Sequence, residues 1–450
     1  MTEEHLMLHF TANGDFDSGR KQLLVLDRGE GCYVYDTGGR RYVDGLSSLF
    51  CCQLGYSYGE EMAAVAGEQL SRLPFNTNWG TAHPPAIELA TRLVELAPLG
   101  MEKVFFTNGG SESVEAAWKL VRQYHVANGE PQRLKAIARD VAYHGVTLGA
   151  LALTGVARFK EPFGDPAIDT RHVANTNPFR SELTGEALTR SLLDELEQAI
   201  VEEGADTVAM VIAEPIQNAG GCLVPPPGYW AGLRQICDRY GILLVADEVI
   251  SGFGRVGEWF AVQRYGGHPD LITVAKGLTS AYAPMGAVLV HERVAEVMSR
   301  PGTTLLHGIT FAGHPLSAVI AKRSIEIFER DQVLENVRRL EPYLRQRLER
   351  DVLSLPVVGD VRGDGFFFAA ELTPDGGEGR FERSEASRLV REIIPPLLLE
   401  AGLIARADDR GDPVLQIAPP LVSDERVLDE VVDAMRWTLQ AAGERMDSAR

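Results

Sequence analysis

The sequence predicts an α/β protein with a large, doubly wound, mostly parallel sheet and a smaller α+β domain. Between residues 61 and 330, helical stretches such as AIELATRLVELA alternate with short apolar runs. Strands that alternate with helices form βαβ units and hence a parallel sheet. From residue 331 this alternation ends, and helices and strands follow in mixed order. We therefore expect a large domain over residues 61–330 and a small α+β domain over residues 331–450.

The first 60 residues predict an irregular arm followed by a β-hairpin. The hairpin is YVYDTGGRRYVDG, whose turn holds Thr37, Gly38 and Gly39. We assign residues 1–60 to the small domain. The next stretch, LSSLFCCQLGYSYG, is rich in aromatic and small residues, which is typical either of packing at a subunit interface or of a pocket wall.

Six apolar runs predict the strands of the large sheet. Each has the length and the β-branched residues of a buried parallel strand. In chain order they are KVFFTN, LKAIARD, VAMVIAEP, ILLVADEV, LITVAK and GAVLVH. In the small domain we expect two helical segments, the strands of GDVRGDGFFFAAEL, a helix near 382–401, the strands LIARADD and VLQIAPP, and a last helix near 424–443.

Charge and composition narrow the class of protein. The 450-residue chain carries 44 Lys and Arg against 63 Asp and Glu, and this net charge of −19 disfavours binding to nucleic acid or anionic membranes. No apolar run approaches the length of a membrane span, and the start MTEEHLMLHF lacks the pattern of a signal peptide. The five cysteines form no CxxC pair, which is typical of reduced thiols. We therefore expect a cytoplasmic protein.

An acid and an amine end two of the predicted strands. GILLVADEV ends in Asp247 and Glu248, and LITVAKG carries Lys276 at its end. Open α/β sheets bind ligands at the carboxyl ends of their strands, so Asp247 and Lys276 are expected to face one crevice. Two interpretations of the pair remain open. It is either a buried ion pair or a pyridoxal phosphate site, in which the lysine forms a Schiff base and the acid contacts the pyridinium nitrogen.

Two further strand ends carry candidate cofactor contacts. GGSES follows KVFFTN and precedes a helical run, a geometry that points the backbone N–H groups of Gly110 and Ser111 at an anion such as phosphate. The alternative is a tight turn with a serine N-cap. Tyr143, in AYHG after LKAIARD, can lie flat on a heteroaromatic ring or pack in the core.

Other motifs disfavour rival chemistries. Residues 252–257 match G-x-G-x-x-G, but no long helix opens at these glycines, so we predict a glycine loop and no dinucleotide site. His307 and His314 have no third ligand type close by, which favours a shaped loop over a metal site. The turn at Gly110 lacks a Walker-type lysine, and no G-x-S-x-G elbow supports a serine hydrolase.

Together these motifs resemble the class III (ω-) aminotransferases, pyridoxal phosphate enzymes of the aspartate-aminotransferase fold, also called PLP-dependent transferase fold type I. The resemblance covers almost the whole chain and is closest to the amine (ω-amino acid):pyruvate group. It runs in order through GGSESVEAA, AYHG, VIAEPIQ, LLVADEVISGFGRVGEWFA, TVAKGL, HGITFAGHP and IAPPL. Seven motifs in order, at compatible spacing, favour the cofactor interpretation over the separate structural ones.

The resemblance implies a role for each matching residue. Lys276 matches the lysine that bonds covalently to pyridoxal phosphate, and Asp247 matches the carboxylate on the pyridine nitrogen, so these two are the implied catalytic residues. Thr310 matches a threonine that reaches the phosphate of the neighbouring subunit, which implies a homodimer or a larger assembly. The other implied contacts to the ring and phosphate are Gly110, Ser111, Tyr143, Glu214 and Val249.

Departures from the family pattern narrow the implied substrate. Members that act on γ- or δ-amino acids are similar to one another in having a second glutamate soon after EPIQ and an arginine before the last proline pair. Ala219 and Gln416 stand there, which disfavours 4-aminobutyrate, ornithine and acetylornithine. Arg406 aligns with the mobile arginine of the amine:pyruvate group, which clamps a carboxylate and swings away for an apolar amine. With Tyr143 and Arg406, Phe50 and Trp79 are implied to line the substrate pocket.

The resemblance therefore implies a transaminase that moves an amino group from an amine or ω-amino acid to pyruvate or a similar keto acid by ping-pong turnover, with (S) selectivity by analogy. The implied partners are the small-molecule amine donor and keto-acid acceptor. Three alternatives remain open. They are another class III reaction (an aminomutase or decarboxylase), a transaminase for a different substrate such as a diamine, and a non-catalytic interaction protein on the same scaffold.

Overall fold

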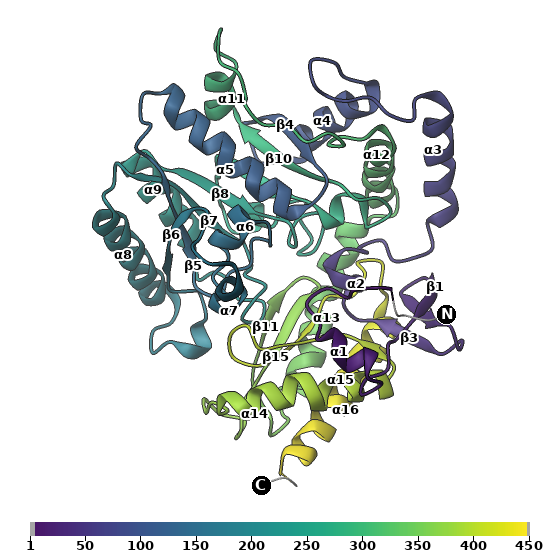
Figure 1. The fold of residues 1–450 in the computed structure, drawn as a ribbon. Coiled ribbons are helices and arrows are strands. Elements are labelled where there is room, and N and C mark those ends of the chain that lie inside the picture. Colours follow the sequence, from purple (N-terminus) through teal and green to yellow (C-terminus); the bar gives the residue numbers. More distant parts are fainter. Residues whose placement is uncertain (1–4, 448–450) are drawn as a thin grey trace.

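The computed structural model describes residues 5–447, and Figure 1 shows it as an upper and a lower part. The upper part holds a large sheet with its helices. The lower part holds the C-terminal residues (light green to yellow), with the N-terminal segment (purple) beside them. Parallel pairing of β3 (Arg41–Asp44) with β13 (Leu403–Ile404) joins these two ends of the chain. The domain bounds at residues 60 and 330 stay a prediction.

The large sheet has seven strands and confirms the predicted fold class, a doubly wound and mostly parallel sheet in an α/β protein. Only β10 runs antiparallel to its neighbours. Across the sheet the order is β4 (Met101–Thr107), β10 (Gly286–His291), β9 (Leu271–Val274), β8 (Leu243–Asp247), β7 (Val208–Ala213), β5 (Lys135–Arg139) and β6 (Asp169–Val173).

The six strands predicted for this sheet are all present, and β6 is the one that the sequence did not reveal. Its sequence is DTRHV, and only Val173 is buried. Because β6 lies at the edge of the sheet, it needs few apolar residues, and the apolar signal of a buried strand is missing.

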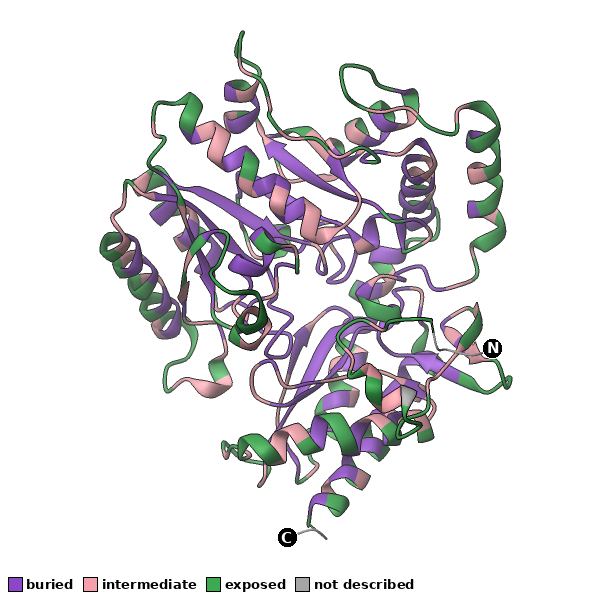
Figure 2. Cartoon of the chain, in the orientation of Figure 1, coloured by how far each residue is buried: buried purple, intermediate pink, exposed green. Residues whose placement is uncertain are grey.

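Alternate residues of each central strand pack on opposite faces of the sheet, as the period of a strand requires. In β8, Leu243 and Val245 pack in the cluster that contains α5 (Gly110–Ala127), α6 (Leu148–Leu153) and α11 (Glu292–Met298). Leu244 and Ala246 pack in the cluster that contains α4 (Pro84–Leu96), α8 (Gly185–Glu203), α9 (Tyr229–Tyr240) and α12 (Pro315–Arg330). The central strands β7, β8 and β9 are therefore buried on both sides, and the helices over them expose mainly their outer faces (Figure 2).

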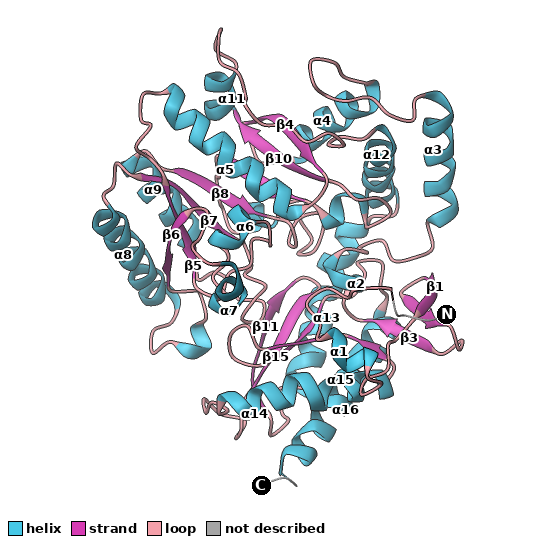
Figure 3. Ribbon diagram, in the orientation of Figure 1, coloured by secondary structure: helices cyan, strands magenta, loops and turns pink. Residues whose placement is uncertain are grey.

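Figure 3 shows helices around the strands of the upper part. The α-helices are α3 (Gly59–Arg72), α4 (Pro84–Leu96), α5 (Gly110–Ala127), α6 (Leu148–Leu153), α7 (Ala157–Lys160), α8 (Gly185–Glu203), α9 (Tyr229–Tyr240), α10 (Ala261–Arg264), α11 (Glu292–Met298) and α12 (Pro315–Arg330). Short 3-10 turns are Glu161–Phe163, Pro178–Arg180 and Lys276–Thr279. In the described part of the chain, none of the helices is long and apolar enough to cross a membrane.

The lower part contains two four-stranded sheets. One has the order β1 (Leu26–Glu30), β2 (Tyr33–Asp36), β3, β13, and it includes the predicted hairpin. The other has the order β11 (Val358–Asp364), β12 (Phe367–Leu372), β15 (Val414–Ile417), β14 (Arg406–Asp408). The helices are α1 (Asn13–Asp17), α2 (Ser47–Phe50), α13 (Val333–Asp351), α14 (Arg383–Arg388), a π-helix (Leu389–Ile393), α15 (Ile394–Glu400) and α16 (Glu425–Asp447).

Two helix predictions for this part need correction. One helix, α13, stands where two segments were expected, because a buried face of Val337, Leu340 and Leu344 continues past the internal Pro342. The helix expected near 382–401 is divided by the π-helix. The two prolines that open α15 lack N–H donors, so the regular α-helical bonds to the preceding turn are interrupted there.

A buried arginine ties the two parts together next to the strand ends. Arg255 follows β8, is fully buried, and donates hydrogen bonds to the carbonyl oxygens of Phe366 (3.2 Å) and Pro419 (2.6 Å) and to the Ser47 hydroxyl (3.1 Å). Burial lowers the pKa of Arg255 to about 10. Its three partners come from the lower part, so this side chain fixes that part against the carboxyl edge of the large sheet.

Candidate active site

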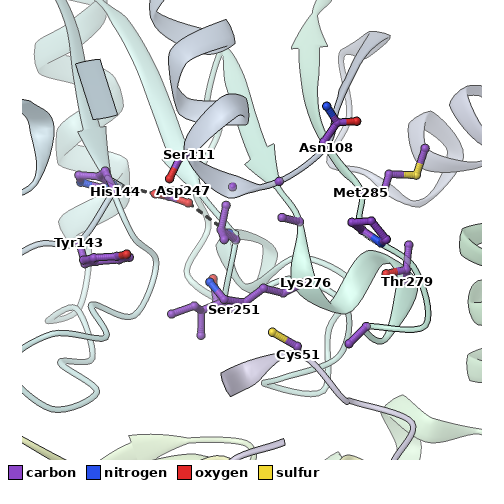
Figure 4. A pocket seen from close by; sticks show the side chains of 18 of the residues that line it. Cys51, Asn108, Ser111, Tyr143, His144, Asp247, Ser251, Lys276, Thr279 and Met285 are labelled. Carbon is purple, nitrogen blue, oxygen red and sulfur yellow. Dashed lines mark hydrogen bonds and ion pairs between the residues drawn. The ribbon is translucent and has the colours of Figure 1, made fainter. Parts of the chain in front are cut away.

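A cavity of about 430 Å³ lies at the carboxyl edge of the large sheet, where β4, β5, β7, β8 and β9 end. Figure 4 shows its side chains converging from these strand ends. A binding site at this edge was predicted from the rule that ligands bind at the carboxyl ends of parallel strands. Its polar lining includes Ser111, Tyr143, His144, Glu214, Asp247 and Lys276.

Lys276 lies just beyond β9, on the first residue of a 3-10 turn. Its φ of 42° is in the left-handed region, where a non-glycine residue costs about 1–3 kcal/mol and is found mostly at functional sites. Burial lowers the pKa of Lys276, although the nearby Cys51, Asp247 and Glu214 act in the other direction. The amine is therefore held in an environment that favours its neutral, nucleophilic form.

Asp247 ends β8 with its side chain 4% exposed and accepts three hydrogen bonds. Its Oδ2 lies 2.7 Å from Nδ1 of His144 (Figure 4), and its Oδ1 accepts from the Thr273 hydroxyl (3.0 Å) and from the backbone N–H of Val249 (3.1 Å). A carboxylate has about four acceptor sites, so about one is left for a donor in the cavity. An N–H⁺ group is the partner that a buried carboxylate favours most.

His144 is a site residue that sequence reasoning missed. It is buried and bonded to Asp247, and its Nε2 has no hydrogen-bond partner among the described residues. With a proton on Nδ1, the imidazole donates to Oδ2 and holds the carboxylate in its orientation. The only signal in the sequence was its place in AYHG beside Tyr143.

The predicted anion-binding turn lies at the N-terminus of α5, an 18-residue helix. Gly109 is the extended N-cap residue, and no side chain caps the helix, so its first N–H groups remain free for an anion. A Cβ on Gly110 would stand 2.8 Å from Cγ1 of Val249, so glycine is needed there for close packing. The Ser111 hydroxyl accepts the N–H of Val146 (3.1 Å) and lines the cavity.

Tyr143 and Val249 line the cavity, as expected for residues on either face of a flat ring. The Tyr143 backbone N–H donates to Oε1 of Glu214 (3.1 Å), whose Oε2 accepts the N–H of Asn218 (2.9 Å). Burial raises the pKa of Glu214, and the Asp247 charge adds to this effect. Glu214 therefore anchors the Tyr143 loop through its hydrogen bonds.

Arg406, in β14, approaches the cavity from the lower part without being one of the residues that line it. Its charge acts on both Lys276 and Tyr143. Burial, and after it the neighbouring Arg410, lower the pKa of Arg406 to about 10. A partly buried guanidinium whose charge reaches Lys276 is placed to bind a carboxylate.

The remaining predicted residues lie outside this cavity in the isolated chain. Phe50 is 1% exposed and packs edge-on against Phe367 at 5.7 Å. Trp79 is 62% exposed and lines a second cavity, and Thr310 is exposed as well. The pocket roles of these residues stay predictions.

The two positions that departed from the pattern for γ- and δ-amino acids are both buried. Gln416 donates from Nε2 to the carbonyl oxygen of Asn218 (2.6 Å), and Ala219 follows in the same loop. Neither position offers a charge to a substrate.

The loops expected around 252–257 and at the two histidines are present. Residues 252–257 form turns, and no helix begins before α10. His307 lies 3.3 Å from the Lys119 amine, whereas His314 accepts the N–H of Leu316 and caps α12. Within residues 5–447, no group of three or more His, Cys, Asp or Glu side chains could hold a metal ion.

Comparisons with known proteins agree with this geometry. Residues 16–439 match the family model Aminotransferase class-III. A probable aminotransferase of Mycobacterium tuberculosis is 45% identical over 99% of this chain and 94% of its own length. The putrescine–pyruvate aminotransferase of Pseudomonas aeruginosa is 39% identical, over 93% of this chain and 91% of its own. The structure of a thermostable (S)-enantioselective omega-transaminase from Thermomicrobium roseum is 37% identical, with a TM-score of 0.92 over 97% of this chain and 96% of that one.

Class-III aminotransferases depend on pyridoxal phosphate, and the residues of the cavity fit this cofactor. The free N–H groups of α5 suit its phosphate, and the spare acceptor site of Asp247 suits its ring nitrogen. The Lys276 amine suits its aldehyde, because burial favours the neutral amine. The expected cofactor is therefore confirmed at the level of the family, and the residues of the cavity match it.

Proposed function

Because this chain belongs to the class-III aminotransferases, we propose that it transfers an amino group from an amine or ω-amino acid to pyruvate or a similar keto acid. One observation carries this proposal. The Lys276 amine, the Asp247 carboxylate and the uncapped start of α5 at Ser111 all face one cavity. A structural ion pair would need only the first two of these groups.

Lys276 is the proposed proton carrier of the reaction. When bound, pyridoxal phosphate supplies the carbonyl carbon that takes up the amino group and the ring that accepts electrons from the substrate Cα. Burial lowers the pKa of Lys276, so its Nζ can take a proton from Cα at a pH where an exposed lysine stays charged. The same nitrogen would hold this proton inside the cavity until it is given back, so that Lys276 would serve both as the base and as the acid.

The other residues hold the reacting groups in place. Asp247, oriented by His144 and Thr273, would keep the ring nitrogen protonated, because an opposite charge favours the charged form. Tyr143 would cover one face of the ring and Val249 the other, so that water is excluded from the reacting carbon.

Arg406 supports a keto acid as amino acceptor. Its guanidinium is partly buried, with 31% of the side chain exposed, and its charge acts on both Lys276 and Tyr143. An α-keto acid carries a carboxylate next to its reacting carbonyl, so a guanidinium can hold it in position. The usual γ-amino acid pattern has a glutamate and an arginine where this chain has Ala219 and Gln416.

A diamine is the second candidate for the amino donor. The relative that supports it is the putrescine–pyruvate aminotransferase, 39% identical to this chain. A diamine has no carboxylate, so it would have to be accepted with Arg406 turned aside, whereas an ω-amino acid would use Arg406 in both half-reactions. Comparing β-alanine with putrescine as donor separates the two.

We also propose that the active unit is a homodimer in the cytoplasm. The second cavity, of about 880 Å³, is surrounded by apolar side chains that are unusually exposed for their size, among them Trp79 (62%), Ile87 (57%) and Leu306 (81%), with Phe311 (59%) close by in the chain. Such a patch is typical of a protein interface. Thr310 is exposed in the same segment, where a second subunit could meet it.

The test is a visible spectrum combined with product analysis. Purified protein with pyridoxal phosphate should be yellow, lose that absorbance with its amino donor, and form alanine from pyruvate and 1-phenylethylamine, β-alanine or putrescine. Lys276→Ala should bind the cofactor without turning over. Release of carbon dioxide, or isomerisation of a single substrate without a keto acid, would instead support another class III reaction, and a protein that stays colourless with the cofactor would support a non-catalytic role.

A further inference from the structure

One carboxylate near the cavity lies between two guanidinium groups. Asp408 accepts a hydrogen bond from Nε of Arg410 at 2.6 Å, and Nη2 of Arg410 contacts the same oxygen. The Arg410 backbone N–H also donates to its Oδ1, at 3.0 Å. Nε of Arg406 is 3.6 Å away, which is an ion pair but too long for a hydrogen bond. Asp408 is therefore bound by Arg410.

The geometry of β14 makes Asp408 a natural partner for Arg406 as well. Arg406 and Asp408 are two residues apart on one strand, so their side chains leave the same face. Arg410 lies in the loop that follows, and its guanidinium stands 5.4 Å from the centre of the Tyr143 ring. Its side chain is only 2% exposed, so it is fixed in this place.

The other carboxylates of this loop are bound elsewhere. Asp409 pairs with Arg158 of α7 (2.5 Å) and with Arg391 of the π-helix (2.9 Å). Asp412 pairs with Arg180 (3.1 Å). Among the described residues, Asp408 is the carboxylate that forms an ion pair with Arg406, and the Arg406 side chain makes no hydrogen bond there.

We propose that Arg410 is a positioning residue that controls carboxylate recognition: by binding Asp408, it keeps the Arg406 guanidinium available for the carboxylate of the substrate. This inference rests on the proposed function, in which Arg406 binds the keto acid. Without Arg410, the buried Asp408 would lose its strongest partner, and a buried carboxylate without a partner is costly. It would then pair with Arg406 on the same strand face and withdraw that guanidinium from the substrate.

The test compares the two half-reactions in Arg410→Met. The KM for pyruvate should rise about 10-fold to 100-fold, which is the loss of affinity expected when a hydrogen bond between two charged groups is removed. The KM for 1-phenylethylamine, which has no carboxylate, should change far less. In a crystal structure of the variant, Arg406 should form hydrogen bonds with Asp408. Arg410→Lys keeps one charged donor for Asp408 and should show a smaller rise.

Removing the competing carboxylate provides the decisive control. In the double variant Asp408→Asn, Arg410→Met, no charge draws Arg406 away, so the KM for pyruvate should return toward that of the parent. If Arg410 acted only by holding the Tyr143 ring, the double variant would stay impaired and the inference would be wrong. Equal changes for pyruvate and 1-phenylethylamine in Arg410→Met would also overturn it. Should Arg410→Met not fold, Arg410→Lys with and without Asp408→Asn makes the same comparison.

Arg406→Met separates this inference from the proposed function. If Arg406→Met leaves the KM for pyruvate unchanged, the proposed role of Arg406 itself fails. If Arg406→Met raises that KM and Arg410→Met does not, only the role of Arg410 fails.

Discussion

Asp247→Asn tests the electrostatic part of the mechanism. The substitution keeps the shape of the side chain, and its Oδ1 can still accept from the Thr273 hydroxyl and the N–H of Val249. The new amide would face His144, which can move its proton to Nε2, a nitrogen that has no other hydrogen-bond partner in the described chain. The variant should therefore fold normally and lose one negative charge beside the ring nitrogen.

The size of the effect follows from that charge. An opposite charge in contact shifts a pKa by about 1 to 3 units, and each unit is about a factor of 10 in the protonated fraction. Because Asp247 is only 4% exposed, water cannot replace its charge. The rate constant for the amine half-reaction should therefore fall by roughly 10- to 1,000-fold in Asp247→Asn.

The assay is stopped-flow absorbance of the bound cofactor after mixing with amine in a single turnover. Thr273→Val is the matched control, since it removes one hydrogen bond to Asp247 but leaves the charge, and should cost about 2- to 10-fold. Cofactor affinity and the unfolding temperature are measured for both variants. If Asp247→Asn with bound cofactor keeps a rate within twofold of the parent, the carboxylate does not act on the ring nitrogen.

Three further outcomes are expected. Gly110→Ala brings a Cβ to 2.8 Å from Val249 and should weaken cofactor binding in an absorbance titration, whereas Gly67→Ala, with open space around it, should not; equal affinities would contradict the packing argument. Burial raises the pKa of Glu248 to about 7. Its contribution to the free energy of unfolding is therefore complete below the unfolded-state pKa of about 4.3 and is lost as the pH rises through 7. The unfolding temperature should fall between pH 5 and pH 8, and it should fall less in Glu248→Gln than in the parent. Leu306→Asp should yield monomers in sedimentation, and an unchanged dimer would place the interface elsewhere.

The sequence predicted the location of those site residues that lie at the ends of strands with a clear apolar pattern. The strand runs ending at Asp247 and Lys276 predicted neighbouring parallel strands, and β8 and β9 pair side by side. The rule that ligands bind at carboxyl ends then brought the two side chains to one cavity. The glycine turn before a helix gave the start of α5 in the same way.

The sequence did not predict contacts between side chains that are far apart in the chain. His144 and Asp247 are separated by 103 positions in the chain and come from strands that have β7 between them, so no local pattern reports their bond. Asp408 forms a hydrogen bond with Arg410 and not with Arg406 because Nε of Arg410 lies about 1 Å closer to its Oδ2. The positions of these three charges in the sequence do not determine such a small difference.

Phe50 lies one layer behind the cavity, in the core cluster that includes Ile216 and Ile250 of the cavity lining. Ser48 and Phe50 both have positive φ values, 59° and 61°, and a local sequence pattern does not predict such an irregular turn. Trp79 and Thr310 present a different limit. Both lie on exposed surface near the second cavity, and the contacts proposed for them would come from a second subunit, which one sequence does not describe.

The most direct test of the central claim is to locate the cofactor on the chain. Borohydride reduction of the protein with bound pyridoxal phosphate, followed by proteolysis and mass spectrometry, should find the phosphopyridoxyl group on Lys276 alone and should find none in Lys276→Ala. Label on another lysine, or equal labelling of the variant, would contradict the account.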